Sequence, residues 1–145
     1  VAGLVGDALS HGAVALVGGE LSHEMGPNFF SPTLLTGCPP QARICTEEIF
    51  GPVANVVNFT EEDEALSSAN SSLSGLAGYV FTQDLSRGLR FAEGLEVGMV
   101  GINDCNISKN IIPFGGVKES GMGREGSVLG LDEYLETKHI CIGGL

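Results

Sequence analysis

The sequence has 145 residues, enough for about one domain with a hydrophobic core. Its formal net charge of -11 argues against binding to nucleic acid, because phosphates need a basic face. Apolar residues make up 43% of the chain, but no apolar run approaches the length of a membrane span, so we predict a soluble globular protein that binds neither nucleic acid nor membrane.

The first third of the chain predicts a helix and two strands. Apolar residues recur at helical spacing over Val1–Leu9, and Gly12 is suited to end this helix. The short apolar run Ala13–Val17 predicts a buried strand. A second strand is expected within Phe29–Thr36, where Pro32 indicates an edge or a bend.

The middle of the chain has the most regular pattern, with three apolar runs separated by two segments of helical spacing. Thr60 and Asp84 are candidate N-caps of the two helices, and Leu85 and Leu89 are expected to face inward on the second. The order strand–helix–strand–helix–strand predicts an α/β fold with a parallel sheet. The three strands are expected at Val53–Phe59, Leu76–Phe81 and Val97–Ile102.

The loop after the third predicted strand is the best candidate for a substrate contact. Ligands of parallel sheets gather beyond the carboxyl ends of the strands, which here means residues 103–112. Ser108 and Lys109 are the main polar candidates in this loop. Alternatively, Ser108 is a turn residue that bonds to its own backbone, and Lys109 is a solvated side chain. The residues alone leave both alternatives open.

Two adjacent carboxylates, Glu47 and Glu48, precede Phe50 and a Gly-Pro pair. Pro52 forces Gly51 out of the α region, so a polar loop should lead here into a strand. A carboxylate can accept hydrogen bonds from two neighbouring hydroxyls, and a ribose diol is one ligand of that kind. The alternative is that both glutamates are ordinary surface acids.

A third motif, residues 121–126, matches G-x-G-x-x-G letter for letter. A dinucleotide-binding fingerprint needs a hydrophobic strand before it and an acid about 20 residues after it. The preceding residues do not form such a run, and Asp132 follows too soon. We therefore interpret these glycines as turns and sites of close packing.

The four cysteines form no C-x-x-C pair and no metal-binding pattern, so no metal is expected. Their number and spacing favour free thiols in a reducing compartment over a disulfide scaffold. No signal or transit segment opens the chain, but Val1 is not a natural start, so this absence is uninformative about targeting.

Two motifs resemble signatures of the NAD(P)-dependent aldehyde dehydrogenases: Glu47-Glu-Ile-Phe-Gly-Pro52 and Pro113-Phe-Gly-Gly-Val-Lys-Glu-Ser-Gly121. Residues 75–82 and 98–103 also fit that family, and the ending is most similar to its succinate-semialdehyde dehydrogenases. The resemblance covers essentially the whole chain but only the C-terminal portion of such a subunit. It implies a catalytic-domain part at 1–118, a connecting loop and helix at 119–133, and an oligomerisation strand and tail at 134–145.

The resemblance implies cofactor and substrate roles for four residues. Glu48 matches the acid that binds the hydroxyls of the nicotinamide ribose, and Phe50 matches the ring beside that ribose. Phe114 matches a ring that lines the aldehyde tunnel, and Ser108 matches a serine that binds the distal carboxylate of the substrate. Lys109 departs from the small residue expected there and adds positive charge near that carboxylate.

Aldehyde oxidation of this kind needs a thiolate nucleophile, a general base, oxyanion donors and a nicotinamide. The resemblance places the nucleophile, the base and the dinucleotide-binding sheet upstream of Val1, so we assign no catalytic residue here. Cys105 lies near the substrate loop but has no basic neighbour closer than Lys109 to lower its pKa. We interpret it as a bystander thiol.

Two functions are therefore expected from the sequence. In the first, the chain is the C-terminal portion of an oxidoreductase that uses NAD or NADP, with NAD favoured, to turn succinate semialdehyde into succinate in 4-aminobutyrate degradation. That enzyme would be a homo-oligomer, a tetramer by resemblance, in the mitochondrial matrix of a eukaryote or the cytoplasm of a bacterium. In the second, the chain is a truncated, inactive protein that associates through Tyr134–Ile142. In either case, apolar surface should be exposed.

Overall fold

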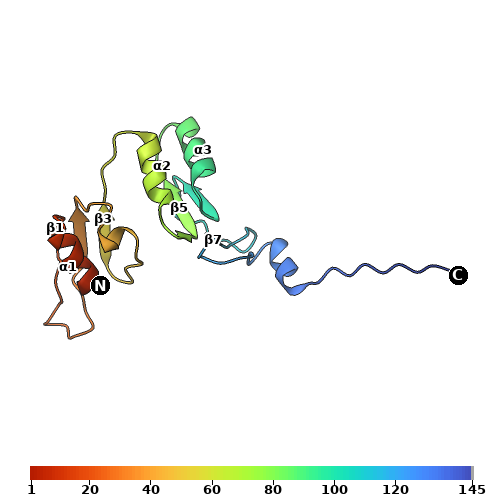
Figure 1. Cartoon of the computed structure of the whole chain (residues 1–145), viewed down its shortest axis with the longest axis horizontal. Coiled ribbons are helices and arrows are strands. Elements are labelled where there is room, and N and C mark those ends of the chain that lie inside the picture. The colour runs from red at the N-terminus through yellow and green to blue at the C-terminus, as the bar shows by residue number, and fades with distance from the viewer. Residues whose placement is uncertain (145) are drawn as a thin grey trace. The chain divides into compact units, whose positions relative to one another are not determined.

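A computed structural model describes residues 1–144 of the chain, which divide into two compact units (Figure 1). The first unit is Val1–Ser72, and the second begins at Leu73. Both units contain helices and a pair of parallel strands. The predicted α/β fold class is therefore confirmed. Within these residues, no helix is both long and apolar enough to cross a bilayer.

The first unit is built on a three-stranded sheet. β1 (Val14–Val17) pairs antiparallel with β2 (Thr33–Thr36), which pairs in parallel with β3 (Val53–Val56). Pro32 directly precedes β2 and therefore removes no hydrogen bond from the ladder. It marks the start of the central strand rather than an edge of the sheet.

The core of the first unit joins this sheet to α1 (Ala2–Ser10). Leu35 of β2 is fully buried against one stripe of the helix. Gly12 follows the helix with a φ of +97°, a conformation that glycine adopts without strain. The predicted helix and its end are confirmed. The buried stripe consists of Leu4, Val5 and Ala8.

Two expectations for the first unit are wrong. β1 is not a buried strand, because it lies at the outside of the sheet and its side chains at Val14, Leu16 and Val17 are 55%, 59% and 58% exposed. Thr60 is not the N-cap of α2 (Glu62–Asn70), because Glu61 takes that position. The backbone N–H of Thr60 donates instead to Oε2 of Glu64, in the first turn of α2, at 3.2 Å.

The second unit contains one of the two predicted strand–helix–strand arrangements. The expected single sheet of three parallel strands is wrong, because β3 pairs with β2 in the sheet of the first unit and not with the strands of the second. β5 (Ala77–Val80) pairs in parallel with β6 (Met99–Ile102), and α3 (Leu85–Gly94) connects them. A second, smaller ladder joins β4 (Ser74–Gly75) antiparallel to β7 (Val117–Lys118). This ladder brings the second signature motif, which contains β7, next to the start of the unit.

Helix α3 begins as predicted but presents a different face to the strands. The Asp84 side chain accepts two backbone N–H groups of the first turn, which confirms the N-cap. Leu85 and Leu89 are 68% and 50% exposed, so their predicted inward orientation is wrong. Gly88 is buried instead, since a Cβ at this position would lie 3.1 Å from Ile102 Cγ2. The missing side chain lets the helix backbone approach β6 closely.

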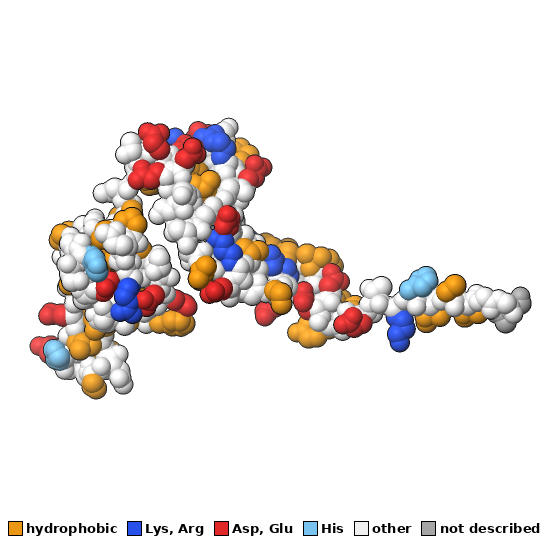
Figure 2. All heavy atoms as spheres, in the orientation of Figure 1, with side chains coloured by type: hydrophobic (Ala, Val, Ile, Leu, Met, Phe, Trp, Pro, Cys, Tyr) orange, Lys and Arg blue, Asp and Glu red, His pale blue; other side chains and the backbone are white. Residues whose placement is uncertain are grey.

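The end of the described chain is exposed and irregular. After the 3₁₀ turn η2 (Leu129–Tyr134), residues 135–144 form neither helix nor strand. Figure 2 shows their side chains uncovered, and Ile140 and Ile142 are 73% and 75% exposed. The predicted strand over Tyr134–Ile142 is therefore not formed in the single chain, since its backbone has no neighbouring strand with which to pair.

Candidate functional site

The loop that carries the paired carboxylates starts at η1 (Arg43–Cys45), a short 3₁₀ turn. The carbonyl oxygen of Arg43 accepts hydrogen bonds from the N–H groups of Thr46 (3.1 Å) and Glu47 (2.8 Å). The Arg43 N–H donates to Oδ2 of Asp7 in α1 at 2.9 Å. These bonds fix the turn internally and fasten it to the first helix.

The side chains of Arg43 and Glu47 form a two-pronged ion pair. Arg43 Nε lies 2.6 Å from Glu47 Oε1, and Nη2 lies 2.9 Å from Oε2. Hydrogen bonding to Arg43 lowers the pKa of the Glu47 carboxyl, and the same bonds raise the pKa of Arg43. Both groups are therefore charged at neutral pH, and both carboxylate oxygens of Glu47 have a partner.

The next acid and the aromatic ring face outward. Glu48 is exposed, and the ring of Phe50 is 85% exposed. Phe50 has a φ of +44°, which is uncommon for a bulky side chain. Strained backbone of this kind concentrates at functional sites. The loop therefore holds an acid and a flat apolar ring where a ligand can reach them.

Both ends of this loop are anchored. Ile44 is 5% exposed in the core of the first unit, and Ile49 packs against that core. At the far end, the Pro52 carbonyl accepts from the Thr33 N–H at 2.8 Å, and β3 begins at the next residue. The predicted loop leading into a strand is thus confirmed, and in the sequence its glutamates lie between the buried Ile44 and the half-buried Ile49.

The second signature motif borders a hollow in the second unit. Phe114 exchanges two backbone hydrogen bonds with Glu125, at 2.8 and 2.7 Å. The hollow beside this bridge has a volume of about 730 Å³, and Phe114, Leu76 and Tyr134 contribute apolar side chains to its lining. An aromatic ring at the edge of a hollow of this size is suited to an apolar substrate wall.

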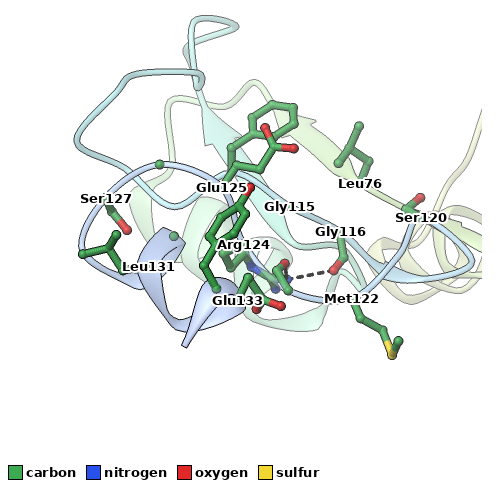
Figure 3. A pocket seen from close by; sticks show the side chains of 15 residues that line it. Leu76, Gly115, Gly116, Ser120, Met122, Arg124, Glu125, Ser127, Leu131 and Glu133 are labelled. Atoms are coloured by element: carbon green, nitrogen blue, oxygen red, sulfur yellow. Dashed lines mark hydrogen bonds between the residues drawn. The ribbon is translucent and has the colours of Figure 1, made fainter. Parts of the chain in front are cut away.

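Arg124 holds the glycine-rich segments around this hollow together (Figure 3). Its Nη1 donates to the carbonyl oxygens of Gly116 at 2.9 Å and Gly123 at 2.6 Å. Gly121, Gly123 and Gly126 have φ values of +114°, +81° and +66°. These left-handed conformations confirm the interpretation of the G-x-G-x-x-G match as turns and close packing.

The candidate substrate loop starts from a rigid corner. The Asn103 side chain exchanges two hydrogen bonds of 2.8 Å with the backbone of Thr82, at the carboxyl ends of β5 and β6. Ser108 and Lys109 follow on the loop and are both exposed. Neither is among the residues that line the Phe114 hollow. The loop therefore presents a hydroxyl and a cation to the outside.

All four cysteines are free thiols. Cys38 lies in the core of the first unit, and burial, together with the nearby Cys45, raises the pKa of its thiol. A raised pKa keeps the thiol protonated and unreactive, as expected of a structural cysteine. Within residues 1–144, no group of three His, Cys, Asp or Glu side chains could hold a metal ion.

The structure places two of the four predicted site residues in each unit, and Ser108 does not line the hollow that Phe114 borders. Glu48 and Phe50 share a loop of the first unit, whereas Ser108 and Phe114 belong to the second. The sequence analysis did not predict the contacts of two arginines, Arg43 and Arg124. The spacing of Arg43 four residues before a glutamate is a recognisable ion-pair signal. Nothing comparable marks Arg124, whose partners are backbone carbonyls.

Comparison with known proteins gives a consistent match. Residues 1–140 match the model of the aldehyde dehydrogenase family. The mitochondrial succinate-semialdehyde dehydrogenase of Rattus norvegicus is 53% identical over 141 residues, which are 97% of this chain and 27% of the rat protein. A non-phosphorylating aspartate-semialdehyde dehydrogenase of Halomonas elongata is 49% identical over 142 residues, or 98% of this chain and 29% of that protein.

A solved structure agrees with these relatives. The crystal structure of an NADP-dependent enzyme from E. coli superposes with a TM-score of 0.92 at 47% identity, covering 98% of this chain and 29% of that one. The chain therefore spans between a quarter and a third of the length of the proteins that it matches.

Proposed function

This chain belongs to the aldehyde dehydrogenase family, and from that premise we propose that it is the C-terminal part of a subunit that oxidises succinate semialdehyde with NAD or NADP. The outward-facing pair of Glu48 and Phe50 on a doubly anchored loop is the observation that carries the proposal. The complete subunit is proposed to be a homo-oligomer, a tetramer by family resemblance, located in the mitochondrial matrix if the organism is a eukaryote.

The chemistry of the loop fits a nicotinamide coenzyme. An exposed carboxylate can accept hydrogen bonds from both hydroxyls of a ribose, and the flat ring of Phe50 offers an apolar surface beside the sugar. When bound, such a coenzyme accepts a hydride from the carbon of the aldehyde. Glu48 would orient the sugar, and Phe50 would limit its movement. The NADP dependence of the E. coli relative and our preference for NAD leave both coenzymes as candidates.

The substrate assignment draws on the loop of residues 103–112. Succinate semialdehyde carries a carboxylate at its far end, which a hydroxyl at Ser108 and a cation at Lys109 are suited to bind. Similarity to the rat enzyme favours this substrate, whereas similarity to the Halomonas enzyme makes aspartate semialdehyde the second candidate. The ring of Phe114 would form an apolar wall for the chain of the aldehyde.

Replacement of Ser108 tests the carboxylate contact. Ser108→Ala in the complete subunit should raise the KM for succinate semialdehyde by roughly tenfold, since a hydrogen bond to a charged group contributes about 1.5 kcal/mol or more. The KM for a neutral aldehyde of similar length should not change. Steady-state kinetics with both aldehydes make the comparison. An equal change for both substrates would contradict a carboxylate role.

A second function, subunit association without activity, is favoured by the exposed apolar residues of the segment 135–144. The polypeptide of 145 residues alone is expected to show no aldehyde oxidation, because the family resemblance supplies no nucleophile within it. An assay of NADH formation, with the complete subunit as positive control, measures this. Turnover by the isolated chain would show that one of its own residues is the nucleophile and would overturn the assignment.

A further inference from the structure

Adjacent carboxylates at Glu47 and Glu48 raise the question of which one is available to a ligand. Their sequence positions are equivalent, but their surroundings differ. Both are exposed, but Arg43 binds both oxygens of Glu47, at 2.6 and 2.9 Å, and so occupies that carboxylate. The asymmetry comes from one arginine, which lies four residues before the first of the two acids.

We propose that Arg43 is a positioning residue for coenzyme binding, which holds Glu47 in a closed ion pair and so leaves Glu48 as the acid that binds the ribose. This inference rests on the proposed function, since it assumes that Glu48 is the coenzyme ligand. It assigns a role in coenzyme binding to Arg43, which does not touch the coenzyme, and gives a physical reason why Glu48 and not Glu47 binds the ribose.

The backbone of Arg43 is held as firmly as its side chain. Its N–H donates to Asp7 at 2.9 Å, and its carbonyl accepts from Thr46 and Glu47. The guanidinium therefore starts from a turn that is fixed by hydrogen bonds and binds the Glu47 carboxylate from it. Because Glu48 is the next residue, the position of its backbone depends on this turn.

The charges of the pair support the same role. Hydrogen bonding lowers the pKa of Glu47 and raises that of Arg43, so the pair stays ionised at neutral pH and is lost only as the pH falls through the lowered carboxyl pKa. The negative charge of Glu47 is thus balanced within the turn. Loss of either partner opens the ion pair and leaves the turn before Glu48 held by its backbone hydrogen bonds alone.

An exposed ion pair contributes little to folding stability, so the effect should appear in binding rather than in unfolding. In the complete subunit, Arg43→Gln and Glu47→Gln should each raise the Kd for NAD by roughly threefold to tenfold, a loss of positioning rather than of a contact. The reversed pair Arg43→Glu/Glu47→Arg should restore most of the affinity. The Tm and the KM for the aldehyde should stay close to those of the unsubstituted enzyme.

Titration calorimetry with NAD on these variants, with Glu48→Gln and Arg43→Lys alongside, separates the outcomes. Arg43→Lys keeps the charge without the two-pronged geometry, so its Kd for NAD should lie between those of the unsubstituted enzyme and Arg43→Gln. If Glu48→Gln weakens binding but Arg43→Gln and Glu47→Gln do not, the positioning role is wrong while the proposed function stands. If Glu48→Gln has no effect, the proposed coenzyme contact fails, and this inference fails with it. If Glu47→Gln is as damaging as Glu48→Gln and reversal of the pair restores nothing, Glu47 is itself a ligand and the inference is overturned.

Discussion

Glu48→Gln in the complete subunit is expected to weaken NAD binding by roughly 10- to 150-fold, the equivalent of about 1.5–3 kcal/mol for a hydrogen bond to a charged group. Glutamine keeps the shape of the side chain but loses the charge and one acceptor oxygen, so the ribose should be held less firmly. The rate of hydride transfer should fall as well, because a mobile ribose places the nicotinamide poorly against the substrate. Calorimetry and pre-steady-state NADH formation measure the two effects.

A control and a modified ligand sharpen this prediction. Glu24→Gln, at another exposed glutamate of the first unit, should leave both measurements unchanged. NAD that lacks a hydroxyl on its nicotinamide ribose should bind the unsubstituted enzyme weakly and should lose little further affinity in the variant. A full additional loss with the modified NAD would mean that Glu48 does not contact that hydroxyl.

Gly98→Ala should give the largest loss of stability among the substitutions considered, about 2–4 kcal/mol. A Cβ at this position would collide with the carbonyl oxygen of Gly115 and lie 2.8 Å from Gly116 Cα. All of these contacts are backbone atoms of the second signature motif, which cannot move aside as a flexible side chain can. The second signature motif, which includes Phe114, would have to shift away from the start of β6.

Thermal unfolding of the complete subunit measures the loss of stability, and the KM for the aldehyde measures the effect of displacing Phe114. Gly3→Ala is the matched control, because a Cβ there would meet no atom within 4 Å. We expect a lower Tm and a raised KM for Gly98→Ala, and neither for the control. An unchanged Tm would show that the close approach of these backbones is not needed in the folded subunit.

The parts of the fold that were predictable depend on local interactions. The N-cap at Asp84, the stop at Gly12 and the strand after Pro52 follow from side-chain and backbone preferences within a few residues. The same holds for the parallel pair β5 and β6 with its connecting helix. For these elements, the periodicity and the capping residues contain enough information.

Apart from the N-cap of α2, the errors concern what covers each surface, which local patterns do not encode. Leu85 and Leu89 have the spacing of an inward stripe, yet the close approach of Gly88 to β6 turns them outward. The apolar run of β1 indicates burial, but in this chain the strand lies at the outside of its sheet. The expectation that apolar surface would be exposed agrees with both observations.

For the candidate site, the sequence and the family resemblance predicted four residues but nothing about their surroundings. Family motifs indicate which residues to compare and contain no information on the hydrogen bonds around them. The ion pair of Arg43 with Glu47 became clear only in the structure, although the sequence shows the spacing of four residues that permits it. The links from Arg124 to Gly116 and Gly123 involve only carbonyls, which every residue has.

The most direct measurement is an experimental structure of the complete subunit with NAD bound. We expect the Glu48 carboxylate to accept hydrogen bonds of about 2.5–3.0 Å from the hydroxyls of the nicotinamide ribose, with the ring of Phe50 in van der Waals contact with that sugar and Glu47 still paired with Arg43. A ribose bound by other residues, with Glu48 directed into solvent, would contradict the central claim.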